Sequence, residues 1–316
     1  MDPRIIDIVK YMNPIFELNI EEKDKNSLVI ADTATDPVVW QGVAAASSAA
    51  GLTPTIAIMT PREHHQDEPA PAVAKAMMES DIYFEVPTKA MAHSLADKEA
   101  QALKRKSIRM EEATYEMLTT GGVTADHREM EKLGIRLENA INAGNTIHVT
   151  SEFGTDLTAK LSKVPCVASC GRCRTEKGHY HTSFPAGECA KGTEQPTGNG
   201  VIVWDTSAHH VGILKEPIKV TVKNNRVVKM EGGSQAQQLR EYIETYGDEN
   251  RWNCPAEISP GLNPKARVRG VMREDKKLLG AVHIAVGNGS GLRSKLHIDG
   301  IIRRPTITVD DKTVIE

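Results

Sequence analysis

The chain has 316 residues, a formal net charge of −3 and a hydrophobic share of 40%. This length can form two ordinary domains, and the interspersed charges leave no basic stripe of the kind that binds nucleic acid. The sequence has no run of about 18 apolar residues, and charged residues interrupt the N-terminal stretch where a signal peptide would be apolar. It therefore predicts a cytoplasmic protein that binds neither nucleic acid nor membrane.

Segments in the first half of the chain alternate between strand-like and helix-like patterns. One helix is marked by Asp36 as N-cap, Pro37 at its first position and Gly51 at its end. The alternation predicts a Rossmann-like parallel sheet with helices on its faces, and no G-x-G-x-x-G follows the first strand to suggest a dinucleotide site. Strands are predicted at residues 27–33, 53–60, 81–86 and 106–111.

Other features of this half are assigned individually. A helix is expected from Pro3 to about Met12, ending before Pro14, because proline disrupts helix interiors. A long amphipathic helix is predicted at 125–144. The polar residues at the strand ends fit turn roles better than a ligand crevice: Asp32, Thr33 and Thr60.

The second half has mainly β patterns. Short strand-like runs separated by turn signals continue to the C-terminus, with one clear helix at 234–247. A hairpin is predicted around Asn224 and Asn225, a favoured pair where both turn residues need positive φ. We therefore predict two domains, a Rossmann-like α/β domain at 1–145 and a β-rich domain at 146–316, with the boundary near Asn145.

A stretch rich in potential metal ligands runs from Leu278 to Val309. Side chains two apart on a strand share a face, so His297 and Asp299 are expected to project together. The glycine-rich loop that precedes them can bring His283 back beside the pair. These residues suit a metal site, although a buried core histidine and a hydrogen-bonded His–Asp pair would explain the spacing equally well.

Cysteines provide a second candidate cluster. An odd count of five argues against a disulfide framework. Cys166, Cys170 and Cys173 have C-x3-C-x2-C spacing, but they lie mid-chain and lack the aromatic residue expected before the last cysteine of a radical-SAM motif, so we expect no iron–sulfur cluster. A zinc site with His179 or His181 is an alternative to three unligated thiols.

Two glutamates stand in small-residue surroundings. Glu188 lies in F-P-A-G-E, and Glu257 follows Pro255 and precedes S-P-G-L-N-P. A carboxylate buried in such a run must be paired or bind a cation. By contrast, His209 and His210 are expected in a surface loop.

These motifs, in this order over residues 180–311, resemble the metal-binding part of the aminopeptidase T family of metallopeptidases. The matching segments are FPAGE, AEISPGLNPKA, LGAVHIAVG and LHIDGIIRRPTITVDD. The resemblance implies a centre of one or two divalent ions (Zn, Mn, Co or Fe), a small-molecule substrate and a homo-oligomer. It implies five metal ligands: Glu188, Glu257, His283, His297 and Asp299.

The same family includes a branch of 2,5-dihydroxypyridine 5,6-dioxygenases, which the C-terminal H-x-D and I-x-R-R motifs also resemble. In that branch a histidine replaces Glu257, and the equivalents of Glu188 and His283 are absent. The aminopeptidases, in turn, have a tyrosine where this chain has Ser290. The resemblance therefore implies a metal site while leaving ordinary peptide hydrolysis in question.

The ligand types favour a metal-activated water that hydrolyses an amide bond of a small substrate, with cyclic and heteroaromatic compounds included. In this interpretation Glu188 and Glu257 also serve catalysis, and the loop that carries Ser290 and Arg293 supplies donors to a substrate oxyanion or carboxylate. The alternatives are an Fe(II) ring-opening dioxygenase that uses His283, His297 and Asp299, and a non-catalytic metal-storage protein.

Overall fold

The structure is a computed structural model that describes residues 2–316. The chain forms two compact units: unit 1 contains the residues up to Arg128 together with Ser169–Ala186, and unit 2 contains Glu129–Ala168 and Gly187–Glu316. Among the described helices, none is both long enough and apolar enough to cross a bilayer. The expected combination of a parallel α/β part and a β-rich part is confirmed.

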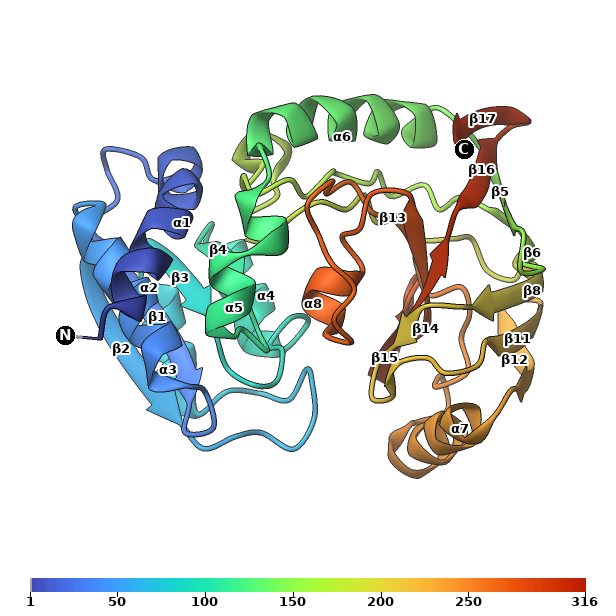
Figure 1. The fold of residues 1–316 in the computed structure, drawn as a ribbon, viewed down its shortest axis with the longest axis horizontal. Helices are drawn as coiled ribbons and strands as arrows, with labels where there is room; N and C mark the ends of the chain where they lie inside the picture. The colour runs from blue at the N-terminus through green and yellow to red at the C-terminus, as the bar shows by residue number, and fades with distance from the viewer. Residues whose placement is uncertain (1) are drawn as a thin grey trace. The chain divides into compact units, whose positions relative to one another are not determined.

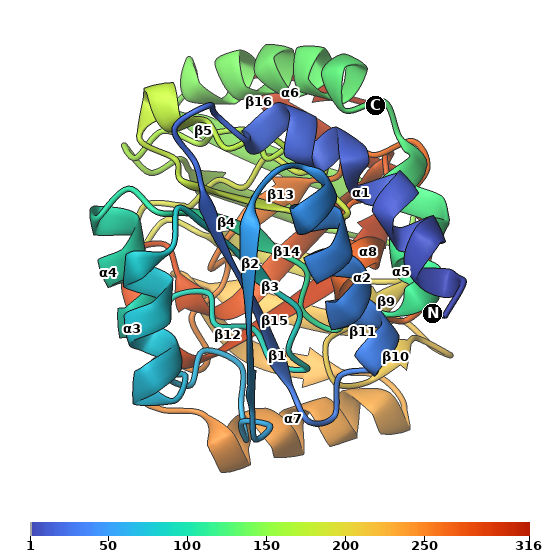
Figure 2. The same ribbon diagram turned by 90° about the vertical axis from the view of Figure 1, so that its left-hand side faces the viewer.

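Unit 1 is built on a five-stranded parallel sheet in the order β2-β1-β3-β4-β7. Helices α1, α2 and α5 pack on one face of this sheet, and α3 and α4 pack on the other (Figure 2). The main elements are α1 (Arg4–Asn19), β1 (Asn26–Asp32), α2 (Pro37–Ala49), β2 (Thr53–Met59), α3 (Pro71–Glu79), β3 (Ile82–Glu85), α4 (Leu95–Ala102), β4 (Lys106–Arg109), α5 (Tyr115–Thr119) and β7 (His181–Ser183).

Helix α1 continues through Pro14, so the predicted end near Met12 is wrong. Proline in a helix interior costs about 3 kcal/mol because it lacks the N–H and crowds the preceding turn. The apolar face of α1 is nevertheless buried on both sides of the proline, through Ile8, Met12 and Phe16. Tertiary packing of this face offsets the local cost, and sequence periodicity alone does not show that packing.

Unit 2 contains two mainly antiparallel sheets (Figure 1). The larger has the order β12-β11-β8-β6-β5-β16-β17, and the smaller has the order β10-β9-β15-β14-β13. The elements are α6 (His127–Asn142), β5 (Thr146–Ser151), β6 (Asp156–Lys160), β8 (Asn199–Trp204), β9 (Ser207–Ala208), β10 (Gly212–Ile213), β11 (Ile218–Lys223), β12 (Arg226–Glu231), α7 (Ser234–Tyr246), β13 (Ile258–Pro260), α8 (Met272–Asp275), β14 (Ala281–Gly289), β15 (Leu292–Arg303), β16 (Pro305–Val309) and β17 (Lys312–Ile315).

A single boundary near Asn145 does not describe these units. Most of α6 belongs to unit 2, and residues 169–186 return to unit 1, where β7 pairs in parallel with β4. Strand β7 has three residues, too few to show a period in the sequence. Its place in the sheet is set by pairing with a strand more than 70 positions earlier, which is a non-local interaction.

Close packing inside unit 2 depends on a glycine at one point. Trp204 is fully buried, and a Cβ built on Gly300 of β15 would lie 2.0 Å from the Trp204 ring. Any larger residue would push β15 away from the indole. Gly300 therefore allows β15, the strand that carries His297 and Asp299, to pack directly against the Trp204 ring.

Candidate metal centre

Strand register gathers the candidate ligands of unit 2 on one face of the smaller sheet. Ala285 pairs with Asp299 and Gly287 pairs with His297 in the β14–β15 hairpin. Residues directly opposite each other point to the same face, so the small side chains at 285 and 287 leave room beside the two ligands. His283 lies on this face of β14, and Glu257 lies opposite Ala285, whose N–H donates to the Glu257 carbonyl.

The His297 imidazole is oriented by a bulge in the facing strand. The register of β14 shifts between Gly287 and Gly289, and His297 Nδ1 lies 2.7 Å from the carbonyl oxygen of Asn288 between them. Gly287 has φ 104°, and a Cβ there would approach Leu296 O to 2.2 Å. With Nδ1–H donating to Asn288, Nε2 points into the site, an arrangement that metal-binding histidines commonly use.

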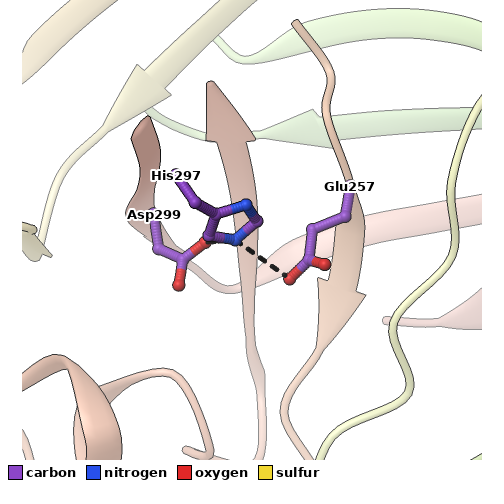
Figure 3. A group of neighbouring side chains, drawn as sticks. All are labelled: Glu257, His297 and Asp299. Atoms are coloured by element: carbon purple, nitrogen blue, oxygen red, sulfur yellow. Dashed lines mark ion pairs between the residues drawn. The ribbon is translucent and has the colours of Figure 1, made fainter. Parts of the chain in front are cut away.

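Three side chains form the centre of the site: Glu257, His297 and Asp299 (Figure 3). One ligand atom from each lies within 4.8 Å of the others. His297 Nε2 is 3.0 Å from Asp299 Oδ1 and 3.7 Å from Glu257 Oε1. The Asp299 side chain is fully buried, whereas the Glu257 side chain is 23% exposed. Solvent and small molecules therefore reach the group from the Glu257 side.

Electrostatics in this group favour charged side chains despite burial. Burial would raise the pKa values of Glu257 and Asp299, but nearby positive charges outweigh it and hold both well below their usual range. For Glu257 these are His297 and His283, and for Asp299 they are chiefly Lys276 and His297. Burial would lower the pKa of His297, and the two carboxylates instead raise it well above its usual value. Without an ion, a proton on His297 offsets the negative charge of the two carboxylates. A bound metal cation would offset the same charge in place of that proton.

The other two predicted ligands lie beside this group. His283 Nε2 is 2.8 Å from Glu257 Oε1, 3.9 Å from Asp299 Oδ1 and 4.0 Å from Glu188 Oε2. All five residues that the sequence singled out are therefore neighbours. Within residues 2–316, however, His283 Nδ1 has no hydrogen-bond partner. A metal-bound imidazole normally donates through its second nitrogen, so His283 is better placed to donate from Nε2 to Glu257 than to bind an ion.

Two lysines that sequence analysis missed complete the site, Lys276 half-buried and Lys277 fully buried. Lys276 Nζ is 2.9 Å from Asp299 Oδ2, and Lys277 pairs with Glu188 Oε1. Burial lowers the pKa of Lys277 to about 7, against the opposing effect of Glu188. In the sequence R-E-D-K-K these lysines read as part of a solvated charged run. Their burial follows from the tertiary position of the segment after α8, which no local pattern indicates.

His209 also belongs to the surroundings of the site, so the expected surface role is wrong for this residue. Its Nδ1 accepts from the Asp299 backbone N–H at 2.8 Å, and the His209 backbone N–H donates to the Asp299 carbonyl at 3.0 Å. These bonds hold Asp299 in place from the neighbouring strand β9. His210 is exposed and stacks on Tyr242 with ring centroids 3.8 Å apart, in line with the surface prediction.

The two predicted substrate donors have different environments. The Ser290 hydroxyl lies 2.9 Å from the Pro255 carbonyl, 2.7 Å from the Ala256 carbonyl and 2.8 Å from the Thr193 backbone N–H. It therefore braces the segment that leads to Glu257, and its role as an oxyanion donor stays a prediction. Arg293 is exposed on the same hairpin, and a role in substrate binding stays a prediction.

The remaining sequence candidates lie outside this group. The Cys173 thiol is 3.9 Å from the Ser107 carbonyl, the Cys166 thiol faces Cys189, and His181 Nδ1 lies 3.2 Å from Gln101 Oε1. None of these cysteines or histidines belongs to a metal-binding group among the described residues. The Asp32 carboxylate accepts from the backbone N–H groups of Ala34 and Thr88, which is the structural turn role predicted for it.

The donor set suits a divalent metal. Asp299 Oδ1 is buried and, apart from its contact with His297, receives no hydrogen bond from the described residues. A buried carboxylate oxygen whose partner is an exchangeable imidazole proton is available to a cation that takes the place of that proton. One imidazole and two carboxylates match the preferences of iron, manganese and zinc. The fold and this group together define an α/β metalloenzyme-like protein with a carboxylate–histidine centre.

Comparison with known proteins identifies the family. The family model for 2,5-dihydroxypyridine 5,6-dioxygenase (NicX) matches residues 8–316. The chain belongs to this family.

Individual relatives agree with this assignment. The 2,5-dihydroxypyridine 5,6-dioxygenase of Pseudomonas putida is 23% identical over 194 residues, which cover 56% of this chain and 55% of that protein. The aligned part thus spans about half the length of the curated relative.

Two solved structures share the fold. The 2,5-dihydroxypyridine dioxygenase structure from Pseudomonas putida KT2440 has a TM-score of 0.81 at 17% identity, covering 98% of this chain and 95% of that one. Wild-type AmpT from Thermus thermophilus has a TM-score of 0.68 at 14% identity, covering 98% of this chain and 99% of that one. The resemblance to aminopeptidase T is thus supported at the level of the fold, and the family is that of the dioxygenase.

Proposed function

We propose that the protein is an iron-dependent enzyme that opens the ring of a hydroxylated N-heteroaromatic compound of the 2,5-dihydroxypyridine type with dioxygen. Family membership supports this activity over amide hydrolysis, which the sequence motifs favoured. The observation that carries the proposal is a three-residue ligand group, the one such group within residues 2–316, in which the His297 imidazole is oriented as a metal ligand. Such a group fits a mononuclear centre.

Glu257, His297 and Asp299 would hold the ion. A bound ferrous ion supplies redox chemistry with dioxygen and coordination positions for a chelating hydroxy-heteroaromatic. Compared with the two-histidine, one-carboxylate triad common in such enzymes, Glu257 adds one negative charge. His283 orients Glu257 through the 2.8 Å contact, and Lys276 and His209 fix Asp299.

Glu188 is the candidate proton acceptor. Its Oε1 pairs with Lys277, whereas its Oε2 is buried and receives no hydrogen bond from the described residues. A hydroxy-heteroaromatic that chelates a metal gives up a hydroxyl proton, and Glu188 Oε2 is available to take it. Once Glu188 is neutral, the buried Lys277 ammonium loses its partner, and Lys277, whose pKa burial lowers to about 7, can release its own proton.

A two-metal amide hydrolase is the second candidate. The observation in its favour is that His283 Nε2 and Glu188 Oε2 lie 4.0 Å apart beside the first group, so five ligand-type residues are present together. Two divalent ions about 3.5–4 Å apart activate water in many hydrolases. The fold shared with AmpT is compatible with this alternative.

Metal stoichiometry and substrate turnover distinguish the two candidates. Protein purified without oxygen and reconstituted with Fe²⁺ should bind one ion per chain and consume dioxygen with 2,5-dihydroxypyridine. Asp299→Ala should do neither, and the exposed control His210→Ala should behave as the parent does. Two ions per chain, with cleavage of small amides and no dioxygen consumption, would instead establish the hydrolase.

A further inference from the structure

Two cysteines of unit 2 meet beside the candidate metal centre. The Cys166 and Cys189 sulfurs are 3.5 Å apart, and the Cys189 thiol is directed at the Cys166 sulfur. Cys189 immediately follows Glu188 in the chain, and its N–H donates to the Pro260 carbonyl on β13. A change at this sulfur pair is therefore transmitted directly to Glu188.

Helix α6 holds Cys166 in position. Asn142 accepts from the Cys166 N–H at 2.9 Å and donates to the Cys166 carbonyl at 2.9 Å. Lys191 Nζ donates to Asn142 Oδ1 at 3.2 Å and to the Val164 carbonyl at 2.8 Å. The Cys189 thiol and Lys191 lower the pKa of Cys166 against the effect of burial. These surroundings favour a reactive sulfur over an inert core thiol.

A cavity lies next to the segments that carry the pair. It has a volume of about 470 Å³, and although neither cysteine lines it, its walls include their chain neighbours Pro165 and Ala190. Both sulfurs are buried, with Cys166 4% and Cys189 0% exposed, yet Cys166 lies in a segment, 162–168, that forms neither helix nor strand. Local opening of this irregular segment, beside the cavity, would give a small oxidant access to Cys166.

We propose that Cys166 and Cys189 are a redox-sensitive dithiol that a peroxide converts into a disulfide, and that the disulfide displaces Glu188. Peroxide oxidises the Cys166 thiol to a sulfenic acid and releases one water. The Cys189 sulfur attacks this sulfur, the S–S bond forms, the S–O bond breaks, and a second water carries away the thiol proton. A disulfide needs about 2.05 Å between sulfurs, so the two residues must approach each other by about 1.5 Å.

Peptide mapping of the metal-free, full-length protein tests the bond itself. After treatment with hydrogen peroxide, the number of thiols per chain should fall by two, and non-reducing digests should link the peptides that contain Cys166 and Cys189. Cys166→Ser and Cys189→Ser should each lose the link, while the matched buried control Cys173→Ser should keep it. If either variant fails to fold, the peptide map of the unsubstituted chain still shows whether the disulfide between Cys166 and Cys189 forms. Oxidation without this link, or no oxidation of either residue, would overturn the proposal.

Binding of Mn²⁺, as a probe that needs no turnover, tests the displacement of Glu188. The oxidised protein should bind Mn²⁺ about tenfold or more weakly, as expected when a residue beside the ligands moves, and a dithiol reductant should restore binding. The Cys189→Ser variant should show no change on peroxide treatment. A disulfide that leaves Mn²⁺ affinity unchanged would refute the coupling to Glu188. These outcomes do not depend on which reaction the centre catalyses.

Discussion

Each unit of the molecule contains a buried group of charges, and the two groups are built differently. In unit 1, Arg109 at the end of β4 donates to both oxygens of Asp97, at 3.1 and 2.9 Å, and its Nε lies 3.7 Å from Glu85 Oε1. In unit 2, Lys276 contacts only Oδ2 of Asp299, and Oδ1 faces His297. The Asp97 carboxylate is saturated, because both oxygens contact the guanidinium and also accept from Tyr83, from the His93 backbone N–H and from Gln101. The Asp299 carboxylate keeps one oxygen for another partner.

This difference separates a structural ion pair from a candidate metal site. Arg109 cannot lose its proton, so the charge it provides is permanent and no cation can replace it. His297 carries a proton that a metal can displace, because imidazole is a ligand in its neutral form. Buried carboxylates alone therefore do not indicate a metal site, whereas a carboxylate balanced by an exchangeable proton does.

The largest contrast is expected between Asp299→Ala and Asp97→Ala. The first should lower metal affinity by more than about a hundredfold, beyond the loss typical of residues outside the ligand shell, and abolish turnover. The second leaves Arg109 buried without its main partner and should destabilise the protein by about 3–5 kcal/mol while metal binding persists in the folded fraction. Calorimetric titration with Mn²⁺ and denaturant unfolding measure the two effects. Equal loss of metal binding in both variants would contradict the comparison.

The two histidines of the hairpin provide a sharper test inside unit 2. His297→Gln removes a ligand and should reduce metal affinity by more than about a hundredfold, whereas His283→Gln removes a supporting donor and should cost about ten- to a hundredfold. Metal titration of both variants measures this difference. Comparable losses, together with a fall from two ions to one in His283→Gln, would favour the two-metal alternative.

The stability contributed by the two charged groups should depend differently on pH, because only the group in unit 2 contains a histidine with a raised pKa. The pKa of Asp97 is lowered by Arg109 against burial, so its stabilising contribution is present above the unfolded value of 3.8 and is lost as pH falls through the lowered pKa. Asp299 behaves in the same way on the acid side. The pKa of His297 is raised above 6.5, so its contribution is full below 6.5 and is lost as pH rises through the raised pKa.

The metal-free protein should therefore lose stability at both ends of the pH range. Saturation with Mn²⁺ should remove the alkaline loss, because the ion takes the place of the His297 proton, and binding should release that proton. Thermal unfolding between about pH 2.5 and 9, with and without Mn²⁺, tests the losses at both ends and the removal of the alkaline one. Calorimetry in buffers of different ionisation enthalpy tests the second. An affinity independent of pH would show that His297 does not bind the ion.

The smallest effect is expected for Ser290→Ala. Loss of the hydroxyl removes the bonds to the Pro255 and Ala256 carbonyls and should destabilise the protein by about 1–3 kcal/mol. Turnover per folded molecule should change less than threefold if the residue is only a brace. A fall of about a hundredfold, with little change in unfolding, would restore the catalytic role that the sequence suggested.

Local sequence signals determined much of this protein. Alternating apolar runs with Asp36, Pro37 and Gly51 as helix signals specified the parallel sheet of unit 1, and Asn224 and Asn225, with φ 50° and 57°, specified a hairpin turn. The spacing of His297 and Asp299 placed both on one face, because strand side chains alternate with a period of two. Backbone conformation and short-range periodicity are properties of neighbouring residues, so the chain shows them directly.

Only the tertiary structure decided how these elements combine. Residues 169–186 joined the sheet of unit 1 through a pairing between β4 and β7, and Lys276 and Lys277 were buried against Asp299 and Glu188. His209 was brought to the Asp299 backbone from 90 positions away. These contacts join segments far apart in the chain, and the free energy that selects them comes from packing and charge pairing that exist only in the folded molecule.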